Sequence, residues 1–168
     1  ASSAASECYR RQYYLSQALN ANVSDVECFV IGGHGDTTMI PVTRFATYKG
    51  MPVTEFLSEE ALQKFAADTL LGGATVTGVL GTSAWYAPGA AAASVVEAVL
   101  GDQKRMVPCS ALLEGEYGEK DLCIGVPCVL GKNGIEKVVE LKLNAAEKDA
   151  FAKSAAGVHK TNAALGEA

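Results

Sequence analysis

The residues best suited to chemistry surround His34, in the segment Gly32-Gly33-His34-Gly35-Asp36, which follows an apolar stretch. Three glycines in four positions let the backbone turn sharply and leave space on both sides of the imidazole. Histidine donates and accepts protons near neutral pH, so the segment favours His34 as a general acid and base. The alternative is a histidine in an ordinary strand turn. Asp36 either orients His34 or stabilises that turn.

Glu7 and Arg10 form a second candidate pair, because a spacing of three residues places them on one face of a helix. A guanidinium holds a carboxylate through two parallel hydrogen bonds, a geometry that lysine does not reproduce. A carboxylate beside His34 would fix the orientation of its ring and favour its protonated form. The alternative is a surface helical ion pair worth about 0.2–0.5 kcal/mol.

Other kinds of site are disfavoured by the motifs that the sequence lacks. No Gly-x-Gly-x-x-Gly follows a strand, and no phosphate-binding loop is present. Ser83 is not in a Gly-x-Ser-x-Gly elbow, which disfavours a serine hydrolase. No Cys-x-x-Cys occurs, and the two histidines stand in unrelated contexts, so no metal site is expected.

The cysteines are expected to be structural. An odd number, five, in an acidic chain predicts reduced thiols in a cytoplasm-like compartment. Four of them lie in apolar, strand-like segments and are expected to be small buried residues: Cys28, Cys109, Cys123 and Cys128.

The surrounding pattern predicts an α+β fold, with antiparallel strands packed by long helices. Helices are expected over 10–21, over 58–80 with an interruption at Gly72-Gly73, over 88–100 and over 144–165. Strands are expected over 26–31, 106–113, 122–130 and 135–141, with an extended run over 38–47. Asn133-Gly134 indicates a hairpin between the last two strands. No linker or repeat divides 1–168, which is expected to be one domain.

Composition limits the partners. The 168 residues are 49% apolar and 20% charged, as in a globular domain, with a net charge of −5. The chain has no basic run, so nucleic acid is not an expected partner. No apolar stretch reaches the roughly 18–20 residues of a membrane helix, and the first residues lack the order of a signal peptide.

Several motifs, taken in order, resemble the C-terminal domain of the lactate/malate dehydrogenase family, most closely the bacterial malate dehydrogenases built on the lactate dehydrogenase plan. Residues 30–37, Val-Ile-Gly-Gly-His-Gly-Asp-Thr, are similar to the family's histidine motif, and 83–88, Ser-Ala-Trp-Tyr-Ala-Pro, to its substrate-pocket segment. Residues 114–118 and 125–134 resemble its late strands and hairpin.

This resemblance implies that His34 exchanges a proton with the substrate hydroxyl, that Arg10 anchors the substrate carboxylate and that Ser83 lines the pocket. Glu7 stands where the family has the aspartate that orients the histidine. The implied reaction is the NAD-dependent oxidation of a 2-hydroxy acid to a 2-keto acid, with malate rather than lactate as the substrate. The resemblance also implies a role in the tricarboxylic acid cycle and a cytoplasmic location. The family binds NAD in an N-terminal Rossmann domain, which 1–168 does not contain, so the chain is expected to be inactive alone.

Two departures from the family pattern leave a second hypothesis open. Glu7 replaces the aspartate, and a one-methylene displacement of a catalytic carboxylate can cost about a hundredfold in rate. Residues 68–75 also differ from the family's usual helix near the subunit contact. The alternative is a non-catalytic scaffold or oligomerisation domain that keeps the fold. A Rossmann domain in trans and a second copy of the chain are the candidate macromolecular partners.

Overall fold

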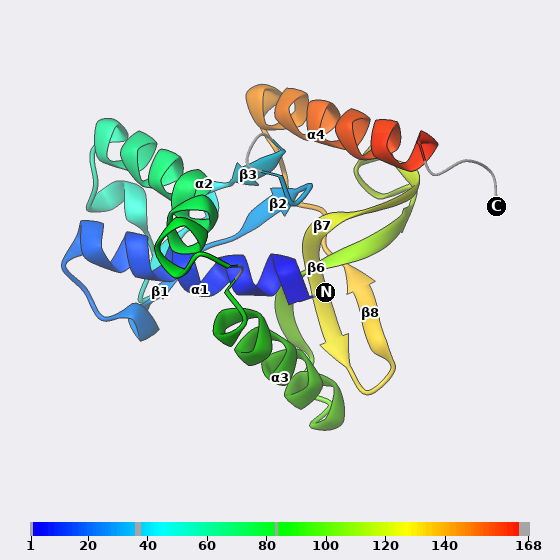
Figure 1. The fold of residues 1–168 in the computed structure, drawn as a ribbon, viewed down its shortest axis with the longest axis horizontal. Helices are drawn as coiled ribbons and strands as arrows, with labels where there is room; N and C mark the ends of the chain where they lie inside the picture. Colours follow the sequence, from blue (N-terminus) through cyan, green and yellow to red (C-terminus); the bar gives the residue numbers. More distant parts are fainter. Residues whose placement is uncertain (1, 36–37, 83, 165–168) are drawn as a thin grey trace.

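The computed structural model describes residues 2–35, 38–82 and 84–164, with side chains from Arg11 onward. It confirms an α+β fold in which every strand pairing among these residues is antiparallel. Four α-helices surround two sheets (Figure 1). The helices are α1 (Ser2–Leu19), α2 (Glu59–Leu80), α3 (Tyr86–Leu100) and α4 (Ala145–Ala163). None of the described helices combines the length and apolarity that a membrane crossing requires.

The large sheet is built on a long hairpin of β6 (Arg105–Glu114) and β7 (Lys120–Gly131). The other edge of β7 pairs with β2 (Val30–Gly32) at Gly125 and with β8 (Gly134–Val138) nearer its end. β3 (Met39–Pro41) pairs with β2 and completes the order β3-β2-β7-β6, with β8 on β7. This sheet holds the core cluster to which α4 contributes Phe151 and Ala155.

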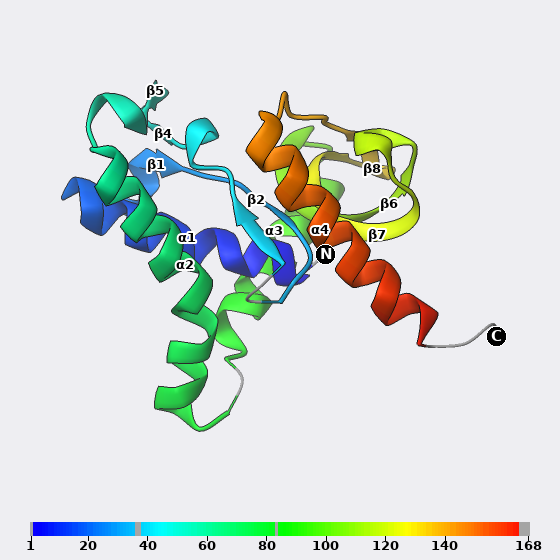
Figure 2. The same ribbon diagram turned by 90° about the horizontal axis from the view of Figure 1, so that it is seen from above.

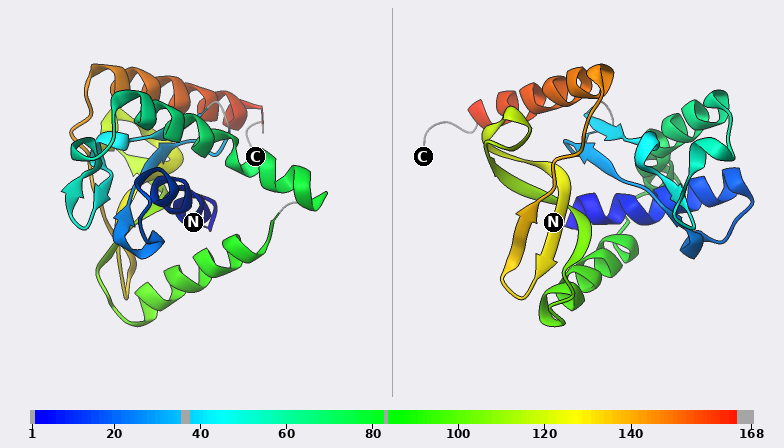
Figure 3. Two further views of the ribbon diagram at one scale, coloured as in Figure 1. Left: turned by 90° about the vertical axis from the view of Figure 1, so that its left-hand side faces the viewer. Right: turned by 180° about the vertical axis from the view of Figure 1, so that it is seen from behind.

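The small sheet has the order β1-β4-β5, from β1 (Val26–Glu27), β4 (Thr47–Tyr48) and β5 (Met51–Pro52). A second apolar cluster joins it to α1 and α2 through Leu15, Leu62 and Phe65. Three 3-10 turns, Val23–Asp25, Thr43–Phe45 and Val53–Glu55, connect its strands to their neighbours, and a fourth, Glu116–Gly118, joins β6 to β7. Figure 3 shows α1 running from the large sheet toward α2, and α1 contacts both β6 of that sheet and α2.

Three expectations about local structure were wrong. The strand predicted over 26–31 is divided, because β1 joins the small sheet and β2 the large one. α2 is continuous through Gly72 rather than interrupted there. Glycine at this position allows close packing, since a Cβ would lie 3.0 Å from the Tyr14 ring. Cys123 is exposed, because it alternates along β7 with buried Leu122 and Ile124.

The predicted starts of α2 and α4 and the hairpin were confirmed, whereas the helix expected over 10–21 begins earlier, at Ser2. Ser58 caps α2 by accepting a hydrogen bond from the Ala61 amide, and Gly131 pairs with Gly134 across the β7–β8 hairpin. The helix expected over 88–100 begins at Tyr86. At α4, the Asn144 Oδ1 accepts from the Glu147 amide at 2.9 Å while the Glu147 Oε2 accepts from the Asn144 amide at 2.7 Å.

Arg44 fastens this capped end of α4. Its guanidinium donates to both carboxylate oxygens of Glu147, at 3.3 and 2.9 Å, and to the Lys142 carbonyl at 2.6 Å. Burial raises the pKa of Glu147, but the hydrogen bonds from Arg44 and from the Asn144 amide, with the Arg44 charge, outweigh it and leave that pKa lowered. The ionised carboxylate therefore stabilises the attachment of α4.

A pH-dependent loss of stability is expected for Glu147→Gln. A lowered pKa in the folded state contributes stability above the unfolded value of about 4.3, and that stability disappears as the pH falls through the folded pKa. Because Arg44 is about half exposed (46%), the expected loss in unfolding free energy at pH 7 is about 1 kcal/mol. Urea denaturation at pH 7 and at pH 3 measures it. An equal loss at both pH values would contradict this expectation, and Glu60→Gln in the first turn of α2 is the control.

Candidate active site

The fold places His34 immediately after β2, a strand that contacts both α1 and α4. β2 ends at Gly32, whose φ of +98° suits glycine and turns the chain out of the sheet. His34 is solvent-exposed. A histidine with a neighbouring cavity and open solvent access is suited to exchanging protons with a bound small molecule.

The glycine turn around His34 is closed by its own hydrogen bonds. The Gly35 amide donates to the Thr38 Oγ1 at 2.8 Å, and that hydroxyl donates to the Gly35 carbonyl at 3.0 Å. The amides of Thr38 and Met39 also donate to the Gly35 carbonyl, at 2.8 and 3.0 Å. The loop that carries His34 is thus anchored on its C-terminal side to the start of β3.

Close backbone contacts fix the N-terminal side of the same loop. Gly32 lies opposite Gly125 of β7, and a Cβ on Gly125 would meet the Gly32 carbonyl oxygen at 2.7 Å. A Cβ on Gly32 would meet the Thr38 carbonyl oxygen at 2.4 Å and the Ser154 Oγ at 2.8 Å. Two glycines therefore allow β2 and β7 to approach closely beneath His34.

Helix α4 lies against this loop and crosses β2 and β3 (Figure 2). Ser154, on α4, accepts a hydrogen bond from the Gly33 amide at 2.8 Å and donates one to the Thr38 carbonyl at 2.7 Å. The helix thus connects to the residue before His34 and to the strand that follows the loop.

A cavity of about 180 Å³ adjoins His34. α1 contributes Arg11 to its lining, the β6–β7 hairpin contributes Ser110 and Cys123, and α4 contributes Val158. The lining combines a guanidinium, an imidazole, a hydroxyl and glycine backbone, all of which can interact with a small polar or anionic molecule.

Arg11 was missed by the sequence reasoning, which assigned the guanidinium of the site to Arg10. The Arg11 side chain is only 1% exposed and lines the His34 cavity. Leu15, four residues later on the same helical face, is fully buried, and that i, i+4 relation was the available signal.

The remaining predicted site residues are only partly described. The backbones of Glu7 and Arg10 belong to α1, a helix that contacts β2, the strand before His34. Their side chains lie outside the described part, as do Asp36 and Ser83. The roles assigned to Glu7, Arg10 and Ser83 therefore stay predictions.

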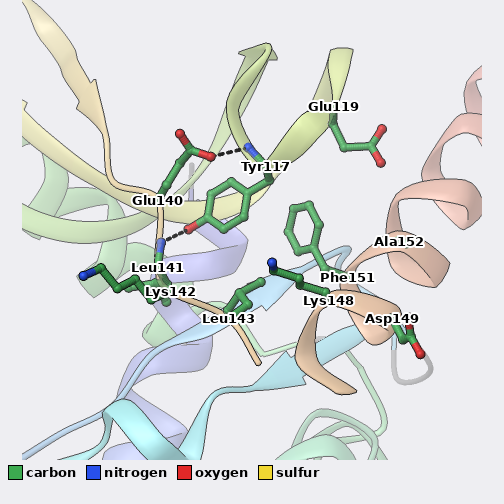
Figure 4. A pocket seen from close by; sticks show the side chains of 10 residues that line it. All are labelled: Tyr117, Glu119, Glu140, Leu141, Lys142, Leu143, Lys148, Asp149, Phe151 and Ala152. Atoms are coloured by element: carbon green, nitrogen blue, oxygen red, sulfur yellow. Dashed lines mark hydrogen bonds between the residues drawn. The ribbon is translucent and has the colours of Figure 1, made fainter. Parts of the chain in front are cut away.

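A larger cavity, of about 680 Å³, lies between the turn that joins β6 to β7, the segment after β8 and the start of α4 (Figure 4). The Tyr117 ring stacks on Phe151 with centroids 4.8 Å apart. Its hydroxyl donates to the Val139 carbonyl at 2.7 Å and accepts from the Leu141 amide at 2.9 Å. Burial, the largest cause, raises the pKa of Tyr117. With its hydroxyl engaged in structural bonds and its pKa raised, Tyr117 is poorly suited to proton transfer.

The buried Cys128 is also unsuited to nucleophilic chemistry. Cys109 and Cys128 lie within the core of the β6–β7 hairpin. A hydrogen bond with Cys109, followed by burial, raises the pKa of the Cys128 thiol, and a protonated thiol is a weak nucleophile. His34 and its cavity are therefore the best candidate active site in the described part of the chain.

Comparison with known proteins gives consistent matches. The family model for the lactate/malate dehydrogenase alpha/beta C-terminal domain matches residues 7–165. Malate dehydrogenase of Bacteroides thetaiotaomicron is 71% identical over 158 residues, 94% of this chain and 50% of that protein. That of Flavobacterium frigidimaris is 62% identical over 156 residues, 93% and 50% of the two chains. The chain spans about half the length of the curated relatives that it matches.

Solved structures agree with these relatives. Malate dehydrogenase of Salinibacter ruber superimposes with a TM-score of 0.92 at 41% identity, over 96% of this chain and 53% of that one. Lactate dehydrogenase of Eimeria maxima, solved with NADH and oxamate, gives a TM-score of 0.90 at 34% identity, over 95% and 51%.

Proposed function

Because the chain belongs to the lactate/malate dehydrogenase family through that family's C-terminal domain, we propose that it is the substrate-binding, proton-transferring part of an NAD-dependent malate dehydrogenase. The observation that carries this proposal is His34 on its anchored glycine turn beside a small cavity that Arg11 also lines. Malate and oxaloacetate are the proposed substrates, since the relatives with the highest identity cited above are named malate dehydrogenases.

In this proposal, His34 takes the proton of the substrate hydroxyl during oxidation and returns it during reduction. Arg10 holds the substrate carboxylate through two hydrogen bonds, and Ser83 lines the pocket beside the reacting carbon. Glu7 orients the imidazole and stabilises its protonated form. The proposed anchoring and orienting residues both lie on α1, and α1 contributes Arg11 to the lining of the His34 cavity.

The described residues do not fit an NAD site. A dinucleotide is held where a parallel strand, a glycine-rich loop and a helix N-terminus meet, whereas all strand pairings described here are antiparallel. The proposal therefore limits these residues to carboxylate binding and proton transfer, and assigns the nicotinamide to a separate Rossmann domain. In the related Eimeria maxima enzyme, NADH and oxamate were bound together.

The exposed start of α3 supports the presence of such a partner. Trp85 and Tyr86 directly follow the Ser83 region and are 63% and 84% exposed. Removing two neighbouring aromatic side chains from water is favourable in free energy, and an exposed apolar patch of this kind marks an interaction surface. We propose that the cofactor-binding domain covers this surface next to the substrate pocket. The thiols of Cys109, Cys123 and Cys128, which are not in disulfides, support a reducing, cytoplasmic location.

The first test is NADH oxidation with oxaloacetate, by the chain alone and by a fusion that places the N-terminal half of the Bacteroides thetaiotaomicron enzyme before it. The chain alone is expected to show no turnover above background, because hydride transfer needs a positioned nicotinamide. The fusion is expected to turn over. Turnover by the chain alone that disappears in His34→Asn would contradict the assignment of the cofactor to another domain.

A non-catalytic scaffold is the second candidate, and two departures from the family pattern favour it. Glu7 stands in the place of the aspartate that the family resemblance implies, and residues 68–75 depart from the family's usual helix near the subunit contact. A fusion that folds and binds NADH but does not reduce oxaloacetate would support the scaffold.

A further inference from the structure

We propose that Ser154 is a positioning residue for His34, an inference that rests on the proposed function. Ser154 lies on α4, far from His34 in the sequence, and its side chain is 2% exposed. Its hydroxyl oxygen bridges the Gly33 amide, at 2.8 Å, and the Thr38 carbonyl, at 2.7 Å. One buried hydroxyl thus holds the backbone on both sides of the histidine.

The direction of these bonds is unusual for a helical serine. Serine and threonine hydroxyls within helices commonly bond the carbonyl four residues earlier, and Thr161 does so on this helix, donating to the Gly157 carbonyl at 3.1 Å. Ser154 instead donates to another segment of the chain. Its hydroxyl contributes to the tertiary contact between α4 and the His34 loop rather than to the helix.

The residues directly before His34 can be held only through their backbone, and the Ser154 hydroxyl supplies a side-chain contact to it. Gly32 and Gly33 lack side chains, and glycine has the greatest backbone freedom of any residue. Gly33 directly precedes His34, and a displacement of about 1 Å in a catalytic group can cost about a hundredfold in rate. Loss of the Ser154 hydroxyl would leave a partly buried amide and a partly buried carbonyl without this partner, which favours movement of the loop.

The test uses nuclear magnetic resonance on the full chain. Hydrogen exchange of the Gly33 amide reports the bond itself, and the shift of the His34 ring on addition of oxamate reports the site. In Ser154→Ala, Gly33 exchange is expected to accelerate by at least about tenfold, while β6–β7 amides change by less than about threefold. The His34 response to oxamate is expected to weaken by at least about tenfold. Ser154→Thr, which retains the hydroxyl, is expected to restore both.

Ala155→Gly is the matched control for loss of stability alone. Ala155 is fully buried on the same helix, and glycine there weakens the helix without removing the hydroxyl. This variant is expected to retain the His34 response to oxamate. If Ser154→Ala does not fold, Ser154→Cys, with a similar volume and a much weaker hydrogen-bonding group, must show the same two effects.

The outcomes separate this inference from the proposed function. Gly33 exchange and oxamate response within about twofold of the wild type in Ser154→Ala would overturn the role of Ser154. Equal weakening of the oxamate response in Ala155→Gly would overturn it as well, by showing that general destabilisation suffices. If oxamate does not shift the His34 ring in the wild-type chain, the carboxylate site is overturned. The positioning role of Ser154 in catalysis is then overturned with it, whatever Gly33 exchange shows.

Discussion

Replacing His34 with asparagine in the fusion enzyme is expected to lower kcat for oxaloacetate reduction by about 10²–10⁴-fold, the usual contribution of a general acid or base. Asparagine has a similar size and can form hydrogen bonds, but it does not exchange a proton near neutral pH. The change should therefore affect the chemical step, with KM altered by less than about threefold. Steady-state kinetics at pH 7 measure both values.

His159→Asn is the matched control, because His159 is the other histidine of the chain. Its Nε2 lies 3.1 Å from the Glu119 Oε2 near the end of α4, and His159 is not among the residues that line the His34 cavity. This variant is expected to retain kcat within about twofold. If His34→Asn retained most of the activity, another group would be the proton donor.

Gly32→Ala is expected to have the largest effect on stability. Its φ of +98° is strained for alanine, and the new methyl group would overlap the Thr38 carbonyl at 2.4 Å and the Ser154 Oγ at 2.8 Å. Backbone strain of about 1–3 kcal/mol and overpacking of about 1–3 kcal/mol together predict a loss of about 2–6 kcal/mol in the free energy of unfolding. Urea denaturation followed by circular dichroism measures this loss.

Gly134→Ala separates the two causes, because Gly134 has a similar φ of +89° but no neighbouring atom within 4 Å of the place that a Cβ would take. It should lose only the strain contribution, about 1–3 kcal/mol. Equal losses for the two variants would show that the close approach of β2, β3 and α4 contributes little, and would remove the structural reason for glycine at the His34 loop.

Most of the fold could be predicted because local chemistry determined it. The Asn144–Glu147 capping box and the Asn133-Gly134 hairpin each depend on residues adjacent in the sequence. The division of 26–31 between two sheets could not be predicted, since apolar periodicity shows that residues are extended and not which partner strand they join.

The candidate site was predictable to a smaller extent. The glycines around His34 indicated a turn that carries a reactive side chain, and the structure has that turn. Ser154 gave no signal, because a serine within a helix has the same local pattern whether its hydroxyl bonds its own helix or a distant loop. Arg11 was overlooked because arginine is rarely buried, and burial depends on tertiary packing.

The most direct test of the central claim, that this chain carries a carboxylate-binding and proton-transferring site, is an oxamate titration of the chain followed on the His34 ring by nuclear magnetic resonance. Wild-type chain is expected to show a saturable shift at millimolar oxamate, and Arg10→Ala is expected to lose it, while Arg44→Ala retains it. A shift that is absent from the wild type, or unchanged in Arg10→Ala, would contradict the claim and favour the scaffold.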